Sequence, residues 1–202
     1  MKKPLAIETI INEDDCQIKY FPKFISSSEY QVKTYTELQN DIKWRQDKIF
    51  LFGKEHNVPR LQAWYADDHL EYTYSGLKMR PQKWNNTLLA LKQKIETLTK
   101  LDFNSVLANL YRDGKDYVAW HSDDEPELGS CPAIASLSFG EERRFLFRKK
   151  SSGKKIEISP AAGSLILMKG ATQHKWQHSI AKTSKKVDAR INLTFRKIIT
   201  KD

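Results

Sequence analysis

The stretch NLYRDGKDYVAWHSDDE, residues 109–125, is the part of the chain around which the rest can be organised. It begins as an extended segment, breaks at Asp113-Gly114 and then presents His121-Ser122-Asp123. Side chains two residues apart on an extended segment point the same way, so the His121 imidazole and the Asp123 carboxylate aim at one point. These are two of the three ligands in a 2-His-1-carboxylate site for non-haem iron. The stretch therefore predicts a metal centre that needs one more histidine.

The third ligand is not fixed by this motif, because so short a pattern often occurs by chance. The candidates are His56, His69, His174 and His178. Only His178 lies in a predicted late strand, where it alternates with Trp176 and Ile180 and could face the first two ligands. For any single histidine, a core or surface residue held by one hydrogen bond remains the plainer interpretation.

The chain after Leu101 is dominated by predicted strands. Short, mostly alternating segments are bounded there by Gly, Ser, Pro or Asp. They lie at 103–111, 116–122, 133–140, 143–150, 154–159, 163–170, 175–181 and 189–198. The pattern indicates two packed antiparallel sheets, a jelly roll or double-stranded β-helix. We predict an α+β fold with this core at about 101–198 and helices packed outside one sheet.

The upstream half predicts two helices and fewer strands. One helix follows the serines at 26–28, which offer an N-cap, and runs to about Asn40; the other runs from Lys83 to about Lys100. After an N-terminal tail, a short strand at 18–24 is expected away from the centre of a sheet, because Pro22 cannot donate a ladder hydrogen bond. The other expected elements are strands at 48–53 and 61–66, a loop at 56–60 and a loop or hairpin at 67–81.

Size and composition favour one globular domain. The chain has 202 residues, of which 40% are hydrophobic, and no apolar run approaches the ~20 residues needed to cross a bilayer. The N-terminus lacks the apolar core of a signal peptide. We expect a protein that is not secreted, cytoplasmic in a prokaryote or nuclear in a eukaryote. Cys16 and Cys131 form no disulfide or metal pattern and are expected to be inert.

The charge is strongly basic. Lys and Arg number 34 against 25 for Asp and Glu, a formal net charge of +9. An excess of this size is typical of nucleic-acid binding, although a basic surface with no partner fits equally well. The excess lies mainly at 143–155 and 182–201, while 123–127 beside the predicted metal centre is acidic.

The last predicted strand places Arg190, Asn192, Thr194 and Arg196 on one face. Two arginines on an inward face need anions, because a buried unpaired guanidinium is costly. A dicarboxylate would satisfy both arginines, and Asn109 and Tyr111, which share a face of another strand, could complete its hydrogen bonds. The alternative is an edge strand whose arginines face solvent.

The order NxYxDGxDxxxxHxD, WxHSI and ARINLTFR resembles the AlkB family of iron(II)- and 2-oxoglutarate-dependent dioxygenases. The similarity runs from about Phe50 to Lys197. It is strongest to the branch that repairs alkylated duplex DNA, together with its homologue that acts on single strands. The resemblance implies that His121, Asp123 and His178 bind iron. It also implies a set of 2-oxoglutarate ligands: Asn109, Tyr111, Arg190, Thr194 and Arg196.

The resemblance also implies substrate contacts, with a nucleotide-recognition region at about 45–82 inside a single dioxygenase domain, 1–202. Phe52-Gly53-Lys54 matches a finger that enters the DNA stack, although Phe52 could instead be a core residue at a strand end. Tyr72, Thr73 and Tyr74 match a nucleotide lid. Asp124 matches a position that contacts the base, although it could be a solvated acid.

The implied reaction is oxidative demethylation of N1-methyladenine and N3-methylcytosine in DNA. Dioxygen and 2-oxoglutarate would become succinate and carbon dioxide, and the methyl group would leave as formaldehyde. We expect a monomer that acts on duplex DNA, with single-stranded DNA as another possible substrate. The sequence leaves open RNA or a protein side chain as the substrate, and also a non-catalytic jelly roll that only binds nucleic acid.

Overall fold

The computed structural model describes residues 5–51, 53–68, 70, 72–74, 77–79 and 81–199. Its strands are β1 (Glu8–Glu13), β2 (Cys16–Phe21), β3 (Lys48–Leu51), β4 (Lys54–Asn57), β5 (Leu61–Ala66), β6 (Tyr72–Tyr74), β7 (Leu77–Met79), β8 (Ser105–Tyr111), β9 (Val118–His121), β10 (Ile134–Gly140), β11 (Phe145–Lys149), β12 (Lys155–Ile158), β13 (Leu165–Gly170), β14 (Trp176–Ile180) and β15 (Arg190–Arg196). Its helices are α1 (Ser28–Asp41), α2 (Asn86–Thr99), a short α3 (Thr172–Lys175) and a 3-10 turn (Pro126–Leu128).

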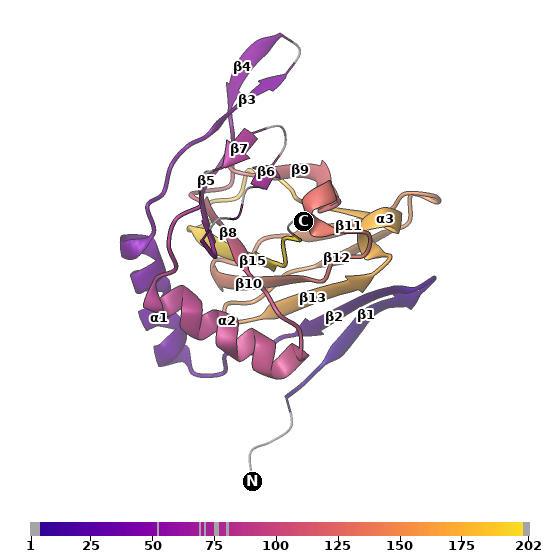
Figure 1. Cartoon of the computed structure of the whole chain (residues 1–202), viewed down its shortest axis with the longest axis horizontal. Helices are drawn as coiled ribbons and strands as arrows, with labels where there is room; N and C mark the ends of the chain where they lie inside the picture. Colours follow the sequence, from indigo (N-terminus) through magenta and orange to yellow (C-terminus); the bar gives the residue numbers. More distant parts are fainter. Residues whose placement is uncertain are drawn as a thin grey trace.

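Two antiparallel sheets form the core, as predicted (Figure 1). The larger has the order β1-β2-β13-β10-β15-β8-β5, and the smaller has the order β12-β11-β14-β9. The strands predicted after Leu101 are all present as β8 to β15. Apart from the pairs β1–β2 and β11–β12, neighbouring strands in these two sheets are not consecutive in the chain, as in a jelly roll.

The large sheet has two different buried faces. One face packs against the small sheet through apolar residues such as Leu107, Phe147 and Trp176. The other face packs against α1 and α2, with Ile191, Leu193 and Phe195 of β15 in the same cluster as Leu38 and the buried leucines of α2. Because side chains alternate along a strand, the opposite face of β15 is left to polar residues. This alternation confirms that the polar row of the last strand faces inward.

Both long helices begin at a side-chain cap. The Ser27 hydroxyl accepts a hydrogen bond from the Tyr30 N–H at 3.2 Å, as the serine run predicted. The Asn85 side chain accepts one from the Leu88 N–H at 2.8 Å, so α2 starts at Asn86 and later than predicted. Trp84 therefore lies outside the helix and stacks on Phe195 with ring centroids 6.5 Å apart.

The N-terminal prediction was wrong in two respects. The expected tail contains β1, and the strand predicted at 18–24 is β2, which begins at Cys16 and ends at Phe21. β2 lies next to the edge of the sheet, between β1 and β13, so it is away from the centre as expected, and Pro22 follows it and removes no ladder hydrogen bond. Asp14 and Asp15 join β1 to β2 with φ of 51° and 61°, a left-handed conformation that Asp tolerates in a tight turn.

The hairpin of β3 and β4 extends away from the two sheets (Figure 1). Gly53 lies at its turn with φ of 75°, where glycine carries no steric penalty. β4 reaches Asn57, so the predicted loop at 56–60 begins later than expected. The predicted loop or hairpin at 67–81 contains the hairpin of β6 and β7. In the described part of the chain, the helices are too short or too polar to span a bilayer.

Candidate active site

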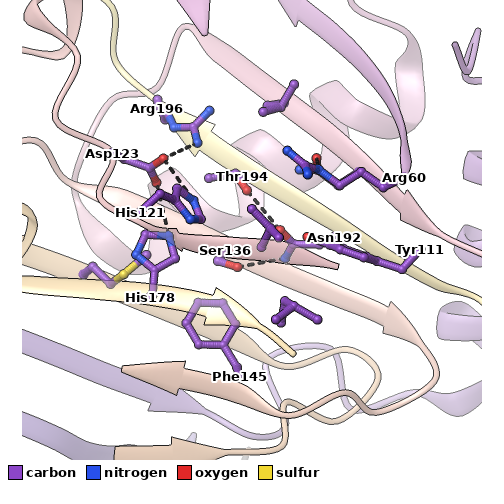
Figure 2. Close-up of a pocket in the computed structure, with 15 residues that line it drawn as sticks. Arg60, Tyr111, His121, Asp123, Ser136, Phe145, His178, Asn192, Thr194 and Arg196 are labelled. Carbon is purple, nitrogen blue, oxygen red and sulfur yellow. Dashed lines mark hydrogen bonds and ion pairs between the residues drawn. The ribbon is translucent and has the colours of Figure 1, made fainter. Parts of the chain in front are cut away.

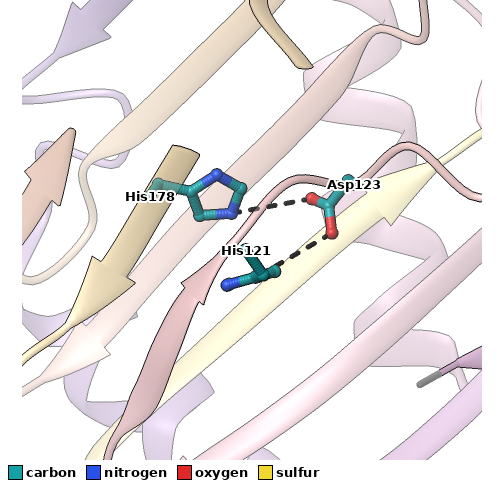
Figure 3. Close-up of side chains that lie close together, drawn as sticks. All are labelled: His121, Asp123 and His178. Atoms are coloured by element: carbon teal, nitrogen blue, oxygen red, sulfur yellow. Dashed lines mark ion pairs between the residues drawn. The ribbon is translucent and has the colours of Figure 1, made fainter. Parts of the chain in front are cut away.

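The predicted histidine and aspartate meet one further histidine across the small sheet. His121 ends β9, and His178 lies directly opposite in β14. Asp123 follows two residues after β9, and its carboxylate oxygens lie 4.0 Å from His121 Nε2 and 3.8 Å from His178 Nε2. One ligand atom from each side chain lies within 4.8 Å of the others (Figure 3). At this spacing one metal ion could bind all three side chains.

The remaining histidine candidates lie elsewhere or outside the described residues. His56 lies on exposed β4. His174 lies in α3, and its Nε2 contacts the Ser130 carbonyl oxygen. His69 is outside the described residues. Among the histidines that the structure describes, His178 is the one that joins His121 and Asp123.

Burial and charge put all three side chains in the protonation state that a metal needs. Burial raises the pKa of Asp123, but the positive charge of Arg196, helped in acid by the two imidazoles in their protonated form, outweighs it and lowers the pKa to about 2. Burial lowers the pKa of His178 to about 3 and also lowers the pKa of His121. An ionised carboxylate and two neutral imidazoles are the donor set of a non-haem Fe(II) site. The residues present therefore fit this metal.

The three side chains lie at one end of a cavity between the two sheets (Figure 2). The cavity is narrow, because its side chains leave only about 30 Å³ for the centre of a water-sized group. Four of the five predicted co-substrate residues line it: Asn109, Tyr111, Thr194 and Arg196. Its apolar wall includes Phe145, whose ring stacks on His178 at 5.5 Å between centroids.

The fifth predicted residue, Arg190, is fully buried behind Tyr111 and is not part of the lining. Its guanidinium lies 5.4 Å from the Tyr111 ring and donates one hydrogen bond, from an Nη to the Ser138 hydroxyl at 2.9 Å. The other two guanidinium nitrogens have no hydrogen-bond partner among the described residues. Burial lowers the pKa of Arg190 to about 10, which leaves it charged at neutral pH. A buried guanidinium with two unpaired N–H groups is costly, and a bound anion would satisfy both its charge and its hydrogen bonds.

The other arginine is engaged with the metal cluster. An Arg196 Nη lies 2.6 Å from Asp123 Oδ1, and both side chains are buried. The sequence predicted Arg196 as a co-substrate residue and did not foresee this ion pair. An anion bound near the metal would therefore share Arg196 with Asp123.

Sequence reasoning did not assign roles to three polar residues of the cavity wall, Asn192, Ser136 and Arg60. Asn192 was visible in the alternation of the last strand, and its Nδ2 donates to the Ser136 hydroxyl at 2.8 Å. Arg60 gave no signal, because it follows Pro59 in an apparent loop. Its Nε donates to Asn109 Oδ1 at 2.8 Å, so it holds a residue that the sequence did identify.

The predicted substrate residues are only partly described. Phe52 and the side chains of Tyr72, Thr73 and Tyr74 lie outside the described residues. Gly53 and Lys54 are exposed at the tip of the β3–β4 hairpin. Asp124 is half-exposed, does not line the cavity, and lies 3.7 Å from Lys150 Nζ.

Comparison with known proteins agrees with this geometry. A model of the 2OG-Fe(II) oxygenase superfamily matches residues 17–196. "Alpha-ketoglutarate-dependent dioxygenase alkB homolog 3" of Bos taurus is 43% identical over 187 residues, 88% of this chain and 64% of the relative. "DNA oxidative demethylase ALKBH2" of Mus musculus is 40% identical over 178 residues, 83% of this chain and 74% of the relative. The resemblance to the AlkB family is confirmed.

Solved structures share the fold at low sequence identity. "The structure of OsALKBH1" superposes with a TM-score of 0.61 at 13% identity, covering 93% of this chain and all of the other. A prolyl hydroxylase from Trichoplax adhaerens gives a TM-score of 0.63 at 12% identity, covering 90% and 83%. The chain spans 57% to 64% of the length of the alkB homolog 3 relatives it matches.

We predict that His178→Ala lowers the affinity for a divalent cation by more than about 100-fold, because even the outer partners of metal ligands contribute 10–100-fold. Titration with Co(II), followed by visible absorption, measures the affinity. His174→Ala is the matched control, since His174 lies four residues away and outside the cluster, and it should bind Co(II) like the parent protein. Equal affinities for the two variants would contradict the assignment of His178.

Proposed function

Because the chain belongs to the 2OG-Fe(II) oxygenase superfamily, we propose that it is an Fe(II)- and 2-oxoglutarate-dependent dioxygenase that demethylates N1-methyladenine and N3-methylcytosine in DNA. One observation carries the proposal. The cluster of His121, Asp123 and His178 opens onto a cavity that ends near Arg190, a buried cation with unused donors. A metal and an anionic co-substrate would thus lie side by side.

In this proposal His121, Asp123 and His178 hold Fe(II), and the cavity holds 2-oxoglutarate. When bound, the two would supply the oxidising chemistry, in which dioxygen and 2-oxoglutarate become succinate and carbon dioxide and the hydroxylated methyl group leaves as formaldehyde. Three ligands from the protein leave coordination positions for the co-substrate and dioxygen.

The chain's own residues bind and orient these components. Arg190 would pair with the carboxylate farther from the metal, after the Tyr111 side chain or the carboxylate moves to meet it. Arg196 would meet the carboxylate nearer the metal while still holding Asp123. Asn109, Tyr111 and Thr194 would complete the hydrogen bonds, and Phe145 and Met168 close the apolar wall against water.

DNA as the substrate class is supported by charge and by relatives. The formal net charge is +9, and the basic segment 143–155 forms β11 and the start of β12, beside the strand that carries His178. The relatives named ALKBH2 are DNA oxidative demethylases at 36% to 40% identity. A methyl group on the pairing edge is reached only when the base leaves the stack, and a lesion that already prevents pairing is cheaper to extrude.

We further propose that duplex DNA is preferred, with Phe52, Gly53 and Lys54 as a finger. This is supported by the exposed β3–β4 hairpin, whose turn is formed at Gly53 and whose Lys54 is free to meet a phosphate. Tyr72, Thr73 and Tyr74 would cover the extruded base, and Asp124 would contact it. The nucleotide-recognition region would then be about 45–82. We propose that the protein acts as a monomer, in the cytoplasm of a prokaryote or the nucleus of a eukaryote.

The proposal predicts turnover of methylated DNA. Oligonucleotides containing N1-methyladenine or N3-methylcytosine are incubated with the protein, Fe(II), 2-oxoglutarate and ascorbate, and formaldehyde and demethylated base are measured. Duplex DNA should turn over faster than single-stranded DNA. Turnover on methylated RNA alone would overturn the DNA assignment, and binding of DNA without turnover on any substrate would leave a non-catalytic nucleic-acid binder.

Replacing Arg190 tests the co-substrate site. Arg190→Met should raise the half-saturating 2-oxoglutarate concentration by about 10–100-fold, because hydrogen bonds to a charged group contribute roughly 1.5–3 kcal/mol each. Arg144→Met is the control, since Arg144 is exposed and pairs with Glu157 at 2.8 Å and 2.7 Å. Succinate formation at varied 2-oxoglutarate gives the constants. An unchanged requirement in Arg190→Met would refute the anion site.

Replacing Phe52 tests the finger. Phe52→Ala should reduce turnover on duplex DNA more than on single-stranded DNA, because only the duplex has a gap to fill after the base leaves. The two rates are measured with the same methylated strand, alone and annealed to its complement, so single-stranded turnover serves as the internal control. Equal losses on both would remove the argument for a finger.

A further inference from the structure

The three metal-binding side chains are not held in place in the same way. His178 lies inside β14, which pairs with β11 on one side and β9 on the other, and His121 is paired opposite it. Asp123 lies two residues beyond the end of β9, in a segment with no regular secondary structure. The sheet ladder therefore fixes both histidines but gives Asp123 no partner.

The Asp123 backbone instead finds a partner in Gln173, which is 1% exposed in the short helix α3. The Asp123 N–H donates to Gln173 Oε1 at 3.0 Å. The amide group of Gln173 is itself oriented, because its Nε2 donates to Met168 Sδ at 3.5 Å. The amide oxygen thus accepts a hydrogen bond from the loop that carries Asp123, and the amide nitrogen donates one to β13 of the large sheet.

Helix α3 is a firm support for this contact. The Thr172 hydroxyl donates to the Lys169 carbonyl oxygen at 2.5 Å and accepts from the Gln17 N–H of β2 at 3.3 Å. The Ala171 N–H donates to the Asp15 carbonyl oxygen at 2.9 Å. α3 is therefore tied to β2 and to the β1–β2 turn of the large sheet, while Gln173 reaches across to the end of β9 in the small sheet.

We propose that Gln173 is a positioning residue for the metal centre, which sets the place of Asp123 through its backbone N–H. This inference rests on the metal site of the proposed function. Arg196 constrains the Asp123 carboxylate from one side, and Gln173 constrains the backbone from the other, so the two together take the place of the missing ladder. The Ser122 hydroxyl donates to the Trp176 carbonyl oxygen at 3.0 Å and restrains the neighbouring residue only.

If the side chain at position 173 only filled space, glutamine would have no advantage over an apolar residue. The site is enclosed, and a buried amide without partners is costly, so an apolar side chain of similar length would fill the space at least as well. The amide group adds a hydrogen bond to the ligand loop, which is the function of the outer partners that orient metal ligands. The loss of such a partner typically lowers metal affinity by 10–100-fold.

The test measures binding of Co(II) alone to the whole protein by visible absorption, with no co-substrate or nucleic acid. Gln173→Met keeps the length of the side chain and removes the acceptor. Gln31→Met is the matched control, because the Gln31 amide lies on α1 and donates to the Ile25 carbonyl oxygen at 2.5 Å, away from the metal cluster. Thermal unfolding of each variant reports on the fold.

Gln173→Met should bind Co(II) about 10–100-fold more weakly than the parent protein, while Gln31→Met binds it equally well. The supporting result includes a melting temperature for Gln173→Met within about 5 °C of the parent. Should Gln173→Met not fold, Gln173→Asn is measured in its place, since it keeps an amide that is too short to reach the Asp123 N–H.

A folded Gln173 variant with Co(II) affinity within about threefold of the parent would overturn the positioning role and leave the metal site standing. If the parent protein itself did not bind Co(II), the proposed metal site would fail, and the inference would fail with it.

Discussion

The negative charge of Asp123 is the constraint on which the rest of the site depends. Its carboxylate is 1% exposed, and a charge so deeply buried is tolerated only with compensating partners. Here the compensation comes from Arg196 at 2.6 Å, from the two imidazoles and, when present, from a cation. A divalent ion between these three side chains would balance the carboxylate more completely than Arg196 alone. The Asp123 carboxylate and the two imidazoles beside it thus define the position that a cation would take.

Strand β15 links this charge to the core. Its apolar side chains face the helices, and its polar row faces the cavity, so one strand serves as packing surface and as binding site. It pairs with β10 on one side and β8 on the other. Through these ladders Arg190 lies opposite Tyr111 and Asn192 lies opposite Asn109. The register of a single pair of strands therefore brings most of the predicted co-substrate residues together.

The features that the sequence predicted correctly are those whose residues alternate along a strand. The jelly-roll strands and the polar face of β15 all follow from alternation, which the backbone geometry enforces locally. The set of His121, Asp123 and His178 was predicted from the chain, with His178 preferred because it alternates within a predicted late strand, and the pairing of β14 with β9 confirms the choice. That pairing is a contact between distant segments.

Other features left no periodic signal. Strand β1 was missed because its residues were assigned to a tail, and the strand predicted at 18–24 was carried past its true end at Phe21. The ion pair of Arg196 with Asp123 and the contacts of Arg60 and Gln173 join residues 49 to 73 positions apart. Such contacts depend on how sheets and loops meet in space, and no local rule of propensity or patterning contains them.

The place of β15 within the large sheet has a consequence for how the molecule opens. A strand paired on both sides and buried on both faces gives up its amide protons to solvent only when the whole sheet comes apart. The β3–β4 hairpin projects from the sheets and β4 is exposed along its length, so it can fray and re-form while that sheet stays intact. Hydrogen exchange would then divide the chain into slowly exchanging sheets, which carry His121 and His178, and a fast-exchanging hairpin. Substitutions in this hairpin could therefore accumulate at little cost to the stability of the two sheets.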